Sequence, residues 1–397
     1  MSWPLIALKD LVDINIGRTP SRDNSDYWGS GTPWLSIRDM SQGKILLKTA
    51  EQITPQALED TKIGIAKKGT VLFSFKLSIG KVGIAGLDMC HNEAIASMPI
   101  KQGVEMCEEY LYFALKQLDS SKDTDRAVMG ATLNKKKMAE LKIPLPPLET
   151  QKQIAAVLEQ ADQLRKDCQQ MEQELNSLAQ SVFIEMFGDP VTNPKGWDKR
   201  PLLELVADKD DIKCGPFGTQ LGKSEFTTEG VPLWGIKHVN SGFKKPTVEF
   251  VSHEKALALK AYSIVGGDIV MTRKGNVGNC YIYPDNLQSG IMHSDLLRIR
   301  PCSSTVSAPF LQKQFMYSKD VEGQLKLISQ GAIMAGINVT KLKSLMLLSP
   351  PLEEQKKFET FLSEVEANKI TLAHKLRESN NIFNSLLQKA FKGELNL

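Results

Sequence analysis

Polar and cationic side chains gather in the turn-rich stretches of this sequence, where they are able to contact a nucleic acid. Cations and amides bind phosphate groups, whereas side-chain donors and acceptors read base edges. In the first half of the chain the candidates are Arg18, Thr19, Ser21, Arg22, Tyr27, Arg38, Lys76, Ser78 and Lys81. In the second half they are Thr219, Lys223, Lys237, His238, Arg273, Lys274 and Asn276. These residues are candidates for contacts with DNA, and the alternative for each is a solvated surface group.

Motifs for catalysis are missing from the sequence. An adenine methyltransferase needs an Asn/Asp-Pro-Pro-Tyr/Phe loop, and the nearest stretch, Asn193-Pro194-Lys195-Gly196, lacks the second proline and the aromatic residue. Gly222-Lys223-Ser224 ends like a phosphate-binding loop, but Phe217 occupies the place of the glycine that such a loop needs. The histidines do not show metal-ligand spacing. We therefore predict no catalytic residue, no metal site and no cofactor in this chain.

The composition is that of a globular protein with more than one domain. The chain has 397 residues, of which 42% are hydrophobic, enough for two or more cores. No apolar run approaches the roughly 18 residues that a membrane-spanning helix needs, and the first residues, MSWPLIALKD, lack a signal-peptide pattern. The cysteines are widely spaced without a Cys-x-x-Cys pair, so we expect free thiols and a cytoplasmic protein.

The stretch from Pro147 to Phe187 predicts one long helix. Proline tolerates the start of a helix, and neither proline nor glycine recurs before Gly188. Apolar residues follow at alternating steps of three and four: Ile154, Val157, Ala161, Leu164, Cys168, Met171, Leu175, Leu178 and Val182. This heptad pattern is typical of a coiled-coil seam. A helix of about 40 residues is roughly 60 Å long.

The sequence repeats itself. Pro146-Pro147-Leu148-Glu149-x-Gln151 recurs 204 residues later as Pro350-Pro351-Leu352-Glu353-x-Gln355. Gly69-Thr70-Val71 resembles Gly267-Asp268-Ile269 at an offset of 198. A period this long indicates a duplicated domain and not a solenoid. A second helix without proline or glycine follows the repeat, from Leu352 to Phe391.

These segments predict an α+β fold with an internal pseudo-two-fold repeat. Two similar mixed α/β domains, at residues 1–146 and 190–349, alternate with long spacer helices at 147–189 and 350–397. Two such helices can pair antiparallel as a coiled coil and bury both seams. The net charge is +2 over 1–148, −5 over 149–189, +6 over 190–352 and 0 over 353–397, so the positive charge lies in the two domains. That distribution suits a nucleic-acid partner.

The order of these segments resembles the specificity subunit of type I restriction-modification systems. The resemblance covers essentially the whole chain and is carried by the two Pro-Pro-Leu-Glu-x-Gln motifs, by Gly17-Arg18-Thr19-Pro20-Ser21, by Tyr27-Trp28-Gly29 and by Pro33-Trp34 with Ile37. It implies a non-catalytic subunit with two target-recognition domains that binds double-stranded DNA. It further implies two methylation subunits and restriction/translocase subunits as partners. S-adenosylmethionine, ATP and magnesium are then expected on those partner subunits.

The second domain departs from the pattern of the first near its start. Its counterpart of the Gly-x-Thr-Pro-Ser stretch is Gly215-Pro216-Phe217-Gly218-Thr219, without a Tyr-Trp pair after it. We therefore expect an asymmetric bipartite target, with an unread spacer set by the helices. The alternative is a coiled-coil adaptor or scaffold protein that does not bind DNA, which the modest net charge permits. Trp34 and Trp234 are predicted to be core residues and not base-stacking platforms.

Overall fold

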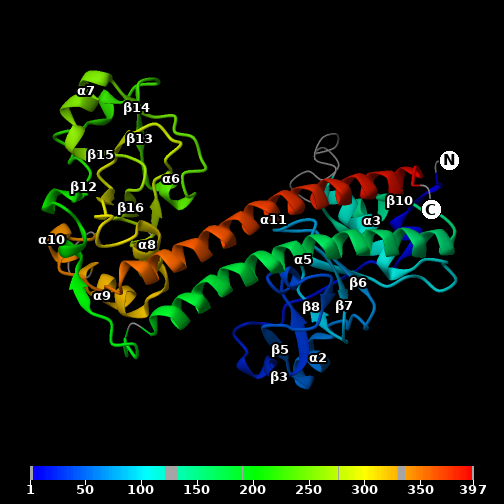
Figure 1. Cartoon of the computed structure of the whole chain (residues 1–397). Helices are drawn as coiled ribbons and strands as arrows, with labels where there is room; N and C mark the ends of the chain where they lie inside the picture. The colour runs from blue at the N-terminus through cyan, green and yellow to red at the C-terminus, as the bar shows by residue number, and fades with distance from the viewer. Residues whose placement is uncertain (1–2, 121–132, 190, 276, 330–335, 396–397) are drawn as a thin grey trace. The chain divides into compact units, whose positions relative to one another are not determined.

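The computed structural model describes residues 3–120, 133–189, 191–275, 277–329 and 336–395 (Figure 1). It divides into two compact units, one of residues 1–169 and 373–397, the other of residues 170–372. The divisions fall inside two long helices, α5 (Leu148–Phe187) and α11 (Leu352–Lys392). Each unit therefore holds the start of one long helix and the end of the other, and the two predicted helices are confirmed. Within the described residues no helix is long and apolar enough to cross a bilayer.

The first unit is a mixed α/β domain. Its strands are β1 (Leu5–Ala7), β2 (Asn15–Ile16), β3 (Trp28–Leu35), β4 (Ile45–Leu46), β5 (Glu51–Ile53), β6 (Val71–Ser74), β7 (Val82–Ala85), β8 (Cys90–His91), β9 (Ile95–Met98) and β10 (Lys142–Pro144). Its helices besides the long ones are α1 (Leu8–Leu11), α2 (Pro55–Thr61), α3 (Glu108–Ser120) and α4 (Lys135–Glu140), with 3-10 turns η1 (Ser25–Tyr27) and η2 (Asp39–Gln42). The sheets have the orders β2-β9-β6-β7-β4, β5-β3-β8 and β1-β10.

The second unit has a closely similar set of elements. Its strands are β11 (Lys199–Pro201), β12 (Ile212–Cys214), β13 (Val231–Trp234), β14 (Phe250–Val251), β15 (Ser263–Ile264), β16 (Ile269–Thr272), β17 (Cys280–Ile282), β18 (Gly290–Met292), β19 (Leu296–Ile299) and β20 (Met346–Leu348). Its helices are α6 (Ile236–Asn240), α7 (His253–Ala258), α8 (Ala308–Tyr317), α9 (Lys319–Ser329) and α10 (Val339–Lys343), with 3-10 turns η3 (Leu202–Leu205), η4 (Lys209–Asp211), η5 (Lys223–Glu225) and η6 (Lys260–Tyr262). The sheets have the orders β12-β19-β16-β17, β14-β13-β18-β15 and β11-β20.

Strand order and pairing confirm the predicted duplication. The order β2-β9-β6-β7 recurs as β12-β19-β16-β17, and β5-β3-β8 recurs as β14-β13-β18. The pairs β3–β8 and β13–β18 are both parallel, with Trp34 opposite Cys90 in the first unit and Trp234 opposite Met292 in the second. Trp34 and Trp234 are both buried, as predicted. The units differ at the sheet edges, where β4 pairs with β7 and β15 pairs with β18.

A buried glutamine explains the repeated Pro-Pro-Leu-Glu-x-Gln motif. Gln151 and Gln355 are both 0% exposed. Each side chain accepts a hydrogen bond from a backbone N–H: Gln151 from that of Cys107, just before α3, at 3.1 Å, and Gln355 from that of Ser307, just before α8, at 2.9 Å. Each also donates to the carbonyl of the first proline of its own motif, at 2.9 and 2.8 Å. The glutamine thereby ties the start of each long helix to the domain before it, because an unpaired buried amide would be costly.

The ends of the long helices pack antiparallel within each unit. In the first unit Leu158 of α5 and Leu387 of α11 belong to one core, which also includes α3. In the second unit Phe183 and Phe187 at the end of α5 contact Phe358 at the start of α11, with ring centroids 5.5 and 5.4 Å apart. Both arrangements bring the start of one helix to the end of the other. The predicted antiparallel packing is therefore confirmed within each unit.

The buried face of α5 differs from the predicted heptad seam. Ile154 and Ala161 of that seam are buried, but Leu164 and Met171 are 59% and 51% exposed. The start of α5 packs against both α3 and the end of α11, so the position next to the seam, Leu158, is fully buried as well. Because α5 also packs against the rest of the first unit, its buried face includes positions outside the a and d positions of the heptad.

Candidate nucleic-acid interface

The loops that carry the first candidates begin at equivalent points of the sheets β2-β9-β6-β7-β4 and β12-β19-β16-β17. A Cβ atom on Gly17 would lie 2.0 Å from the carbonyl oxygen of His91, and one on Gly215 would lie 2.1 Å from that of His293. Real Cβ atoms do not approach so closely, so glycine is needed at both places. The loops that follow β2 and β12 thus start from the same backbone contact. Burial lowers the pKa of His91 to about 4, which keeps it neutral in this structural position.

Two indoles fix the path of the loop in the first unit. Trp34 Nε1 donates to the carbonyl of Arg18 at 3.0 Å, and Trp28 Nε1 donates to the carbonyl of Ser21 at 3.0 Å. Arg18 and Ser21 remain exposed at the surface. The guanidinium of Arg18 donates to the carbonyl of Thr61 at 2.7 Å. The loop backbone is therefore ordered by buried or half-buried tryptophans, which leaves its polar side chains on the outside.

Arg22 forms the centre of a cation–aromatic cluster. Its guanidinium carbon lies 3.7 Å from the centroid of Trp28, and its Nη2 donates to Glu51 at 2.9 Å. The hydrogen bonds from Arg22 hold the pKa of Glu51 below its usual range. A shallow cleft of about 350 Å³ lies against Trp28 and Glu51. A nucleic acid would have to compete with Glu51 for the hydrogen-bonding edge of this guanidinium.

The hydroxyl groups of Thr19 and Tyr27 also donate hydrogen bonds to carboxylates. The Thr19 hydroxyl donates to Glu93 and holds the pKa of that carboxyl below its usual range, with a further contribution from Lys76. The Tyr27 hydroxyl donates to Asp60 at 3.2 Å. Glu93 therefore binds the loop after β2 and is attracted electrostatically by Lys76 in the turn after β6.

The remaining candidates of the first unit fall into two groups. Lys76, Ser78 and Arg38 are exposed. Lys81 is half-buried, and its Nζ donates to the carbonyl of Ile37 at 3.1 Å and to Ser41 Oγ at 2.7 Å. Lys81 therefore ties the start of β7 to the connection after β3, and in this position it stabilises the unit.

In the second unit the loop and the turn again meet. Thr219 and Lys223 are exposed on the loop after β12. The guanidinium of Arg273, on the turn after β16, lies 5.6 Å from the ring of Phe217, while its Nε donates to the carbonyl of Ile337 at 3.1 Å. A cation–aromatic contact thus joins the loop after β12 to the turn after β16.

Three further candidates of the second unit can be compared with the first. Lys274 pairs with Asp295 at 2.7 Å, whereas Lys76 at the equivalent position contributes to the lowered pKa of Glu93. Lys237 pairs with Glu249 at 3.6 Å and is half-exposed. Asn276 lies outside the described residues.

His238 does not have the position expected of a DNA contact. Its side chain is fully buried, and its Nδ1 accepts a hydrogen bond from the backbone N–H of Gly235 at 2.9 Å. The ring also packs edge-on against Trp234 at 5.0 Å between centroids. Burial lowers its pKa. The prediction for His238 is corrected here, because a neutral core imidazole cannot reach a base edge from this position.

Two exposed apolar residues near these candidates were missed by reasoning from polar residue types. Leu77 lies between Lys76 and Ser78 and is 88% exposed, and Phe217 beside Arg273 is 54% exposed. The offset-198 repeat holds a signal for Leu77, since it aligns this leucine with Gly275. A leucine opposite a turn glycine is unexpected for a purely structural position.

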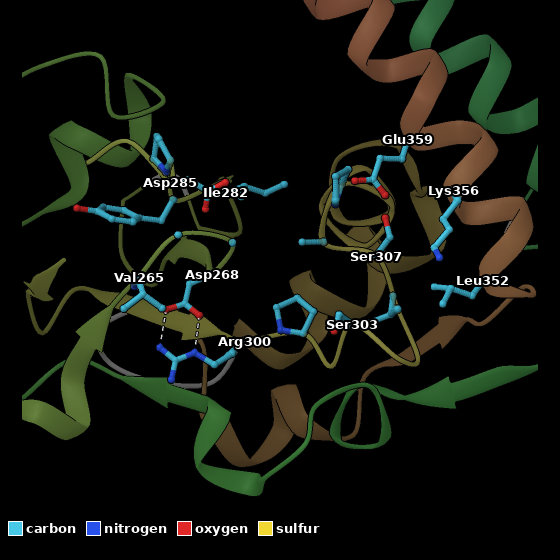
Figure 2. A pocket seen from close by; sticks show the side chains of 18 residues that line it. Val265, Asp268, Ile282, Asp285, Arg300, Ser303, Ser307, Leu352, Lys356 and Glu359 are labelled. Carbon is cyan, nitrogen blue, oxygen red and sulfur yellow. Dashed lines mark hydrogen bonds and ion pairs between the residues drawn. The ribbon is translucent and has the colours of Figure 1, made fainter. Parts of the chain in front are cut away.

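A hollow of about 550 Å³ lies elsewhere in the second unit (Figure 2). Arg300 faces Asp268 there with Nε–Oδ1 and Nη2–Oδ2 distances of 2.7 and 2.8 Å. Asp268 is buried and also accepts from the backbone N–H of Val265 at 2.9 Å. Because this carboxylate is satisfied by groups of its own unit, the ion pair stabilises the turn before β16.

Comparisons with known proteins agree on one family. The sequence model of the family described as type I restriction modification DNA specificity domain matches residues 2–177 and again residues 194–379. The type I restriction enzyme MjaIX specificity subunit of Methanocaldococcus jannaschii is 24% identical over 423 residues, covering 99% of this chain and 93% of that protein.

Two solved structures have the same fold. One, from work on complex assembly and conformational transition of the type I R-M system, matches with a TM-score of 0.62 and 18% identity over 99% of this chain and 98% of its own. The crystal structure of the type I restriction-modification system S subunit from M. genitalium matches with a TM-score of 0.55 and 15% identity over 98% and 96% of the two chains.

Proposed function

Because the chain belongs to the family of type I restriction-modification DNA specificity domains and carries two copies of that domain, we propose that it is the DNA-recognition subunit of a type I complex. The observation that carries the proposal is a repeated scaffold with different loops. Strand order, the Gly17 and Gly215 contacts and the buried glutamines recur. The loops that start from this scaffold do not recur. Two similar domains with different loops suit an asymmetric bipartite target in double-stranded DNA.

The partner subunits of this chain then carry out the methylation and restriction reactions of the complex. The chain itself is non-catalytic and assembles in the cytoplasm with two methylation subunits and with restriction/translocase subunits. S-adenosylmethionine, ATP and magnesium bind to those subunits. Residues 1–146 and 190–349 are the recognition domains, and residues 147–189 and 350–397 are the spacer helices. The absence of a methyltransferase loop and of a phosphate-binding motif in the sequence supports this division of labour.

Methylome sequencing tests the proposal directly. Cells that express this chain with its methylation subunits should carry methylated adenines in one motif, made of two different half-sites and an unread spacer. Cells with the methylation subunits alone are the control. A methylome that does not depend on this chain would overturn the proposal. A lack of sequence-dependent protection of duplex DNA by the assembled complex would instead favour the scaffold hypothesis.

The spacer offers a second test of the same function. Deleting four residues from the middle of α5 shortens the helix by about 6 Å, or roughly two base pairs of duplex. We expect the unread spacer of the target to change in length while both half-sites stay the same. Replacing the same four residues with alanine keeps the helix length and should leave the spacer as it was. An unchanged spacer after the deletion would refute the ruler role of the helix.

A further inference from the structure

The turn between β6 and β7 presents a leucine that the first unit does not use for packing. Leu77 is 88% exposed, more than any other large hydrophobic residue in the described part of the chain. Its φ of 64° is left-handed. For a branched side chain this conformation is unfavourable, because Cβ crowds the following carbonyl oxygen. The residue is therefore strained and also gains nothing from burial.

Ser74 holds the turn in this shape. The backbone N–H of Ser74 donates to the carbonyl of Lys81 at 2.9 Å, and the N–H of Lys81 donates back to Ser74 Oγ at 2.9 Å. The Ser74 hydroxyl donates to the carbonyl of Ser78 at 2.5 Å. A strained residue persists only where its surroundings fix it, and such residues are concentrated at binding sites.

The second unit contains the same turn without the leucine. Gly275 occupies the position of Leu77 in the offset-198 repeat, with a φ of 73°. Gly80 and Gly278, three residues later, also match, with φ of 95° and 88°. Glycine satisfies this backbone without strain. The turn itself therefore does not need a leucine, and the side chain must be explained by something outside the unit.

The surroundings of Leu77 favour a nucleic acid over a protein. Lys76 and Ser78 on either side of it are exposed and polar, and Lys76 lies close enough to Glu93 to lower its pKa. Protein interfaces bury contiguous apolar patches, which a single leucine between polar residues does not provide. In the major groove, by contrast, thymine presents a methyl group to apolar side chains, beside phosphates that attract cations.

We propose that Leu77 is a specificity-determining residue that contacts the 5-methyl group of a thymine in the half-site read by the first domain. Lys76 contacts a neighbouring phosphate in the same arrangement. The inference rests on the proposed function, since it assumes that the first domain reads duplex DNA. It predicts an asymmetry between the half-sites, because Gly275 supplies no side chain at the equivalent place.

Deoxyuridine substitution tests this contact, because it removes only the methyl group of thymine. In the complex of this chain with its methylation subunits, each thymine of the first half-site is replaced in turn. Burial of one methyl group corresponds to roughly a 4-fold change in affinity. We expect about that loss at one position with the unchanged chain and no loss there with Leu77→Gly. Leu5→Ala, which shortens another exposed leucine of the first unit, should bind the thymine-containing target more tightly than the deoxyuridine-containing one to the same degree as the unchanged chain.

Each other outcome has a definite meaning. Insensitivity of the unchanged complex to every thymine methyl group of the first half-site would overturn the proposal. So would undiminished discrimination by Leu77→Gly. Loss of co-purification of Leu77→Gly with the methylation subunits would assign the leucine to a protein contact and overturn it as well. Equal binding of target and unrelated duplex by the unchanged complex would instead mark failure of the proposed function.

Discussion

The two units hold their long helices by different means. In the first unit Asp162 of α5 is buried among cations, with Arg165 at 3.0 Å and Lys166 at 2.9 Å, and the guanidinium of Arg165 lies 4.3 Å from the ring of Phe383 on α11. In the second unit the position equivalent to Asp162 is Glu366, a carboxylate that is 65% exposed. The helix ends are joined there by aromatic contacts between Phe183, Phe187 and Phe358. The two units therefore share strand order and helix direction, but different side chains stabilise them.

The same contrast holds for the loops. A stacked arginine between Trp28 and Glu51 organises the first loop, whereas Phe217 and Arg273 meet in the second. Both loops nevertheless start from glycines in the same contact with a carbonyl oxygen. The side chains of the loops have thus diverged as well, whereas the backbone contacts that position the loops are retained.

The largest effect is expected in the aromatic cluster. Phe183→Ala should destabilise the second unit by about 4 kcal/mol, because a fully buried ring leaves a cavity. Hydrogen exchange of α8 amides in the full chain measures the loss. Ile184→Ala, at a partly exposed position one residue later, is the control and should cost less than about 1 kcal/mol. Equal effects of the two variants would show that the cluster does not hold the unit together.

The buried glutamines should behave alike if the scaffold is truly repeated. Gln151→Leu and Gln355→Leu each leave buried backbone groups unpaired, at a cost of about 3 kcal/mol. Exchange of α3 amides reports on the first variant and exchange of α8 amides on the second. Gln153→Leu changes an exposed glutamine of the same helix and should be nearly neutral. A much larger loss of stability in one variant than in the other would show that the two glutamines do not have equivalent roles.

The charged cluster should matter only in the first unit. Asp162→Ala leaves Arg165 and its neighbours unpaired, which should cost about 2 kcal/mol because those cations are partly solvated. Glu366→Ala, at the position 204 residues later, removes a carboxylate that is 65% exposed and should cost little. Thermal unfolding of both variants at neutral pH checks the difference. A Glu366 effect as large as that of Asp162 would contradict it.

Low pH should remove the stabilisation that the Asp162 cluster gives the first unit. Burial acts to raise the pKa of Asp162, but Lys116, Lys166 and Arg165 outweigh it and hold the pKa below the ordinary 3.8. The cluster therefore stabilises the first unit above that value, and the contribution is lost as the pH falls through the lowered pKa. Hydrogen exchange of α3 amides between pH 5 and pH 2 should show a decline that Asp162→Ala lacks. Parallel profiles would count against this assignment.

The smallest effect on stability should come from Arg22. Its ion pair with Glu51 is half-exposed, so Arg22→Ala should cost less than about 1 kcal/mol. Recognition of the first half-site should nonetheless weaken in the methylome, while the second half-site is read as before. Lys237→Ala is the mirror control in the second unit. Equal changes in both half-sites would show that the two loops do not read separately.

Sequence patterns determined the long helices, the duplication and the buried tryptophans. Prolines, glycines and apolar periodicity act over a few residues, so Leu148–Phe187 and Leu352–Lys392 could be predicted almost to the residue. The repeated Gln151 motif also predicted where the second long helix begins. The candidate loops were found through their polar composition and turn formers.

Only the tertiary structure decided which of those polar residues face solvent. Lys81 and His238 resemble surface cations in the sequence, yet contacts with Ile37 and with the core around Trp234 bury them wholly or in part. Leu77 resembles a core residue and is exposed. The physical reason is that burial depends on contacts between distant segments, which residue type and local spacing do not specify.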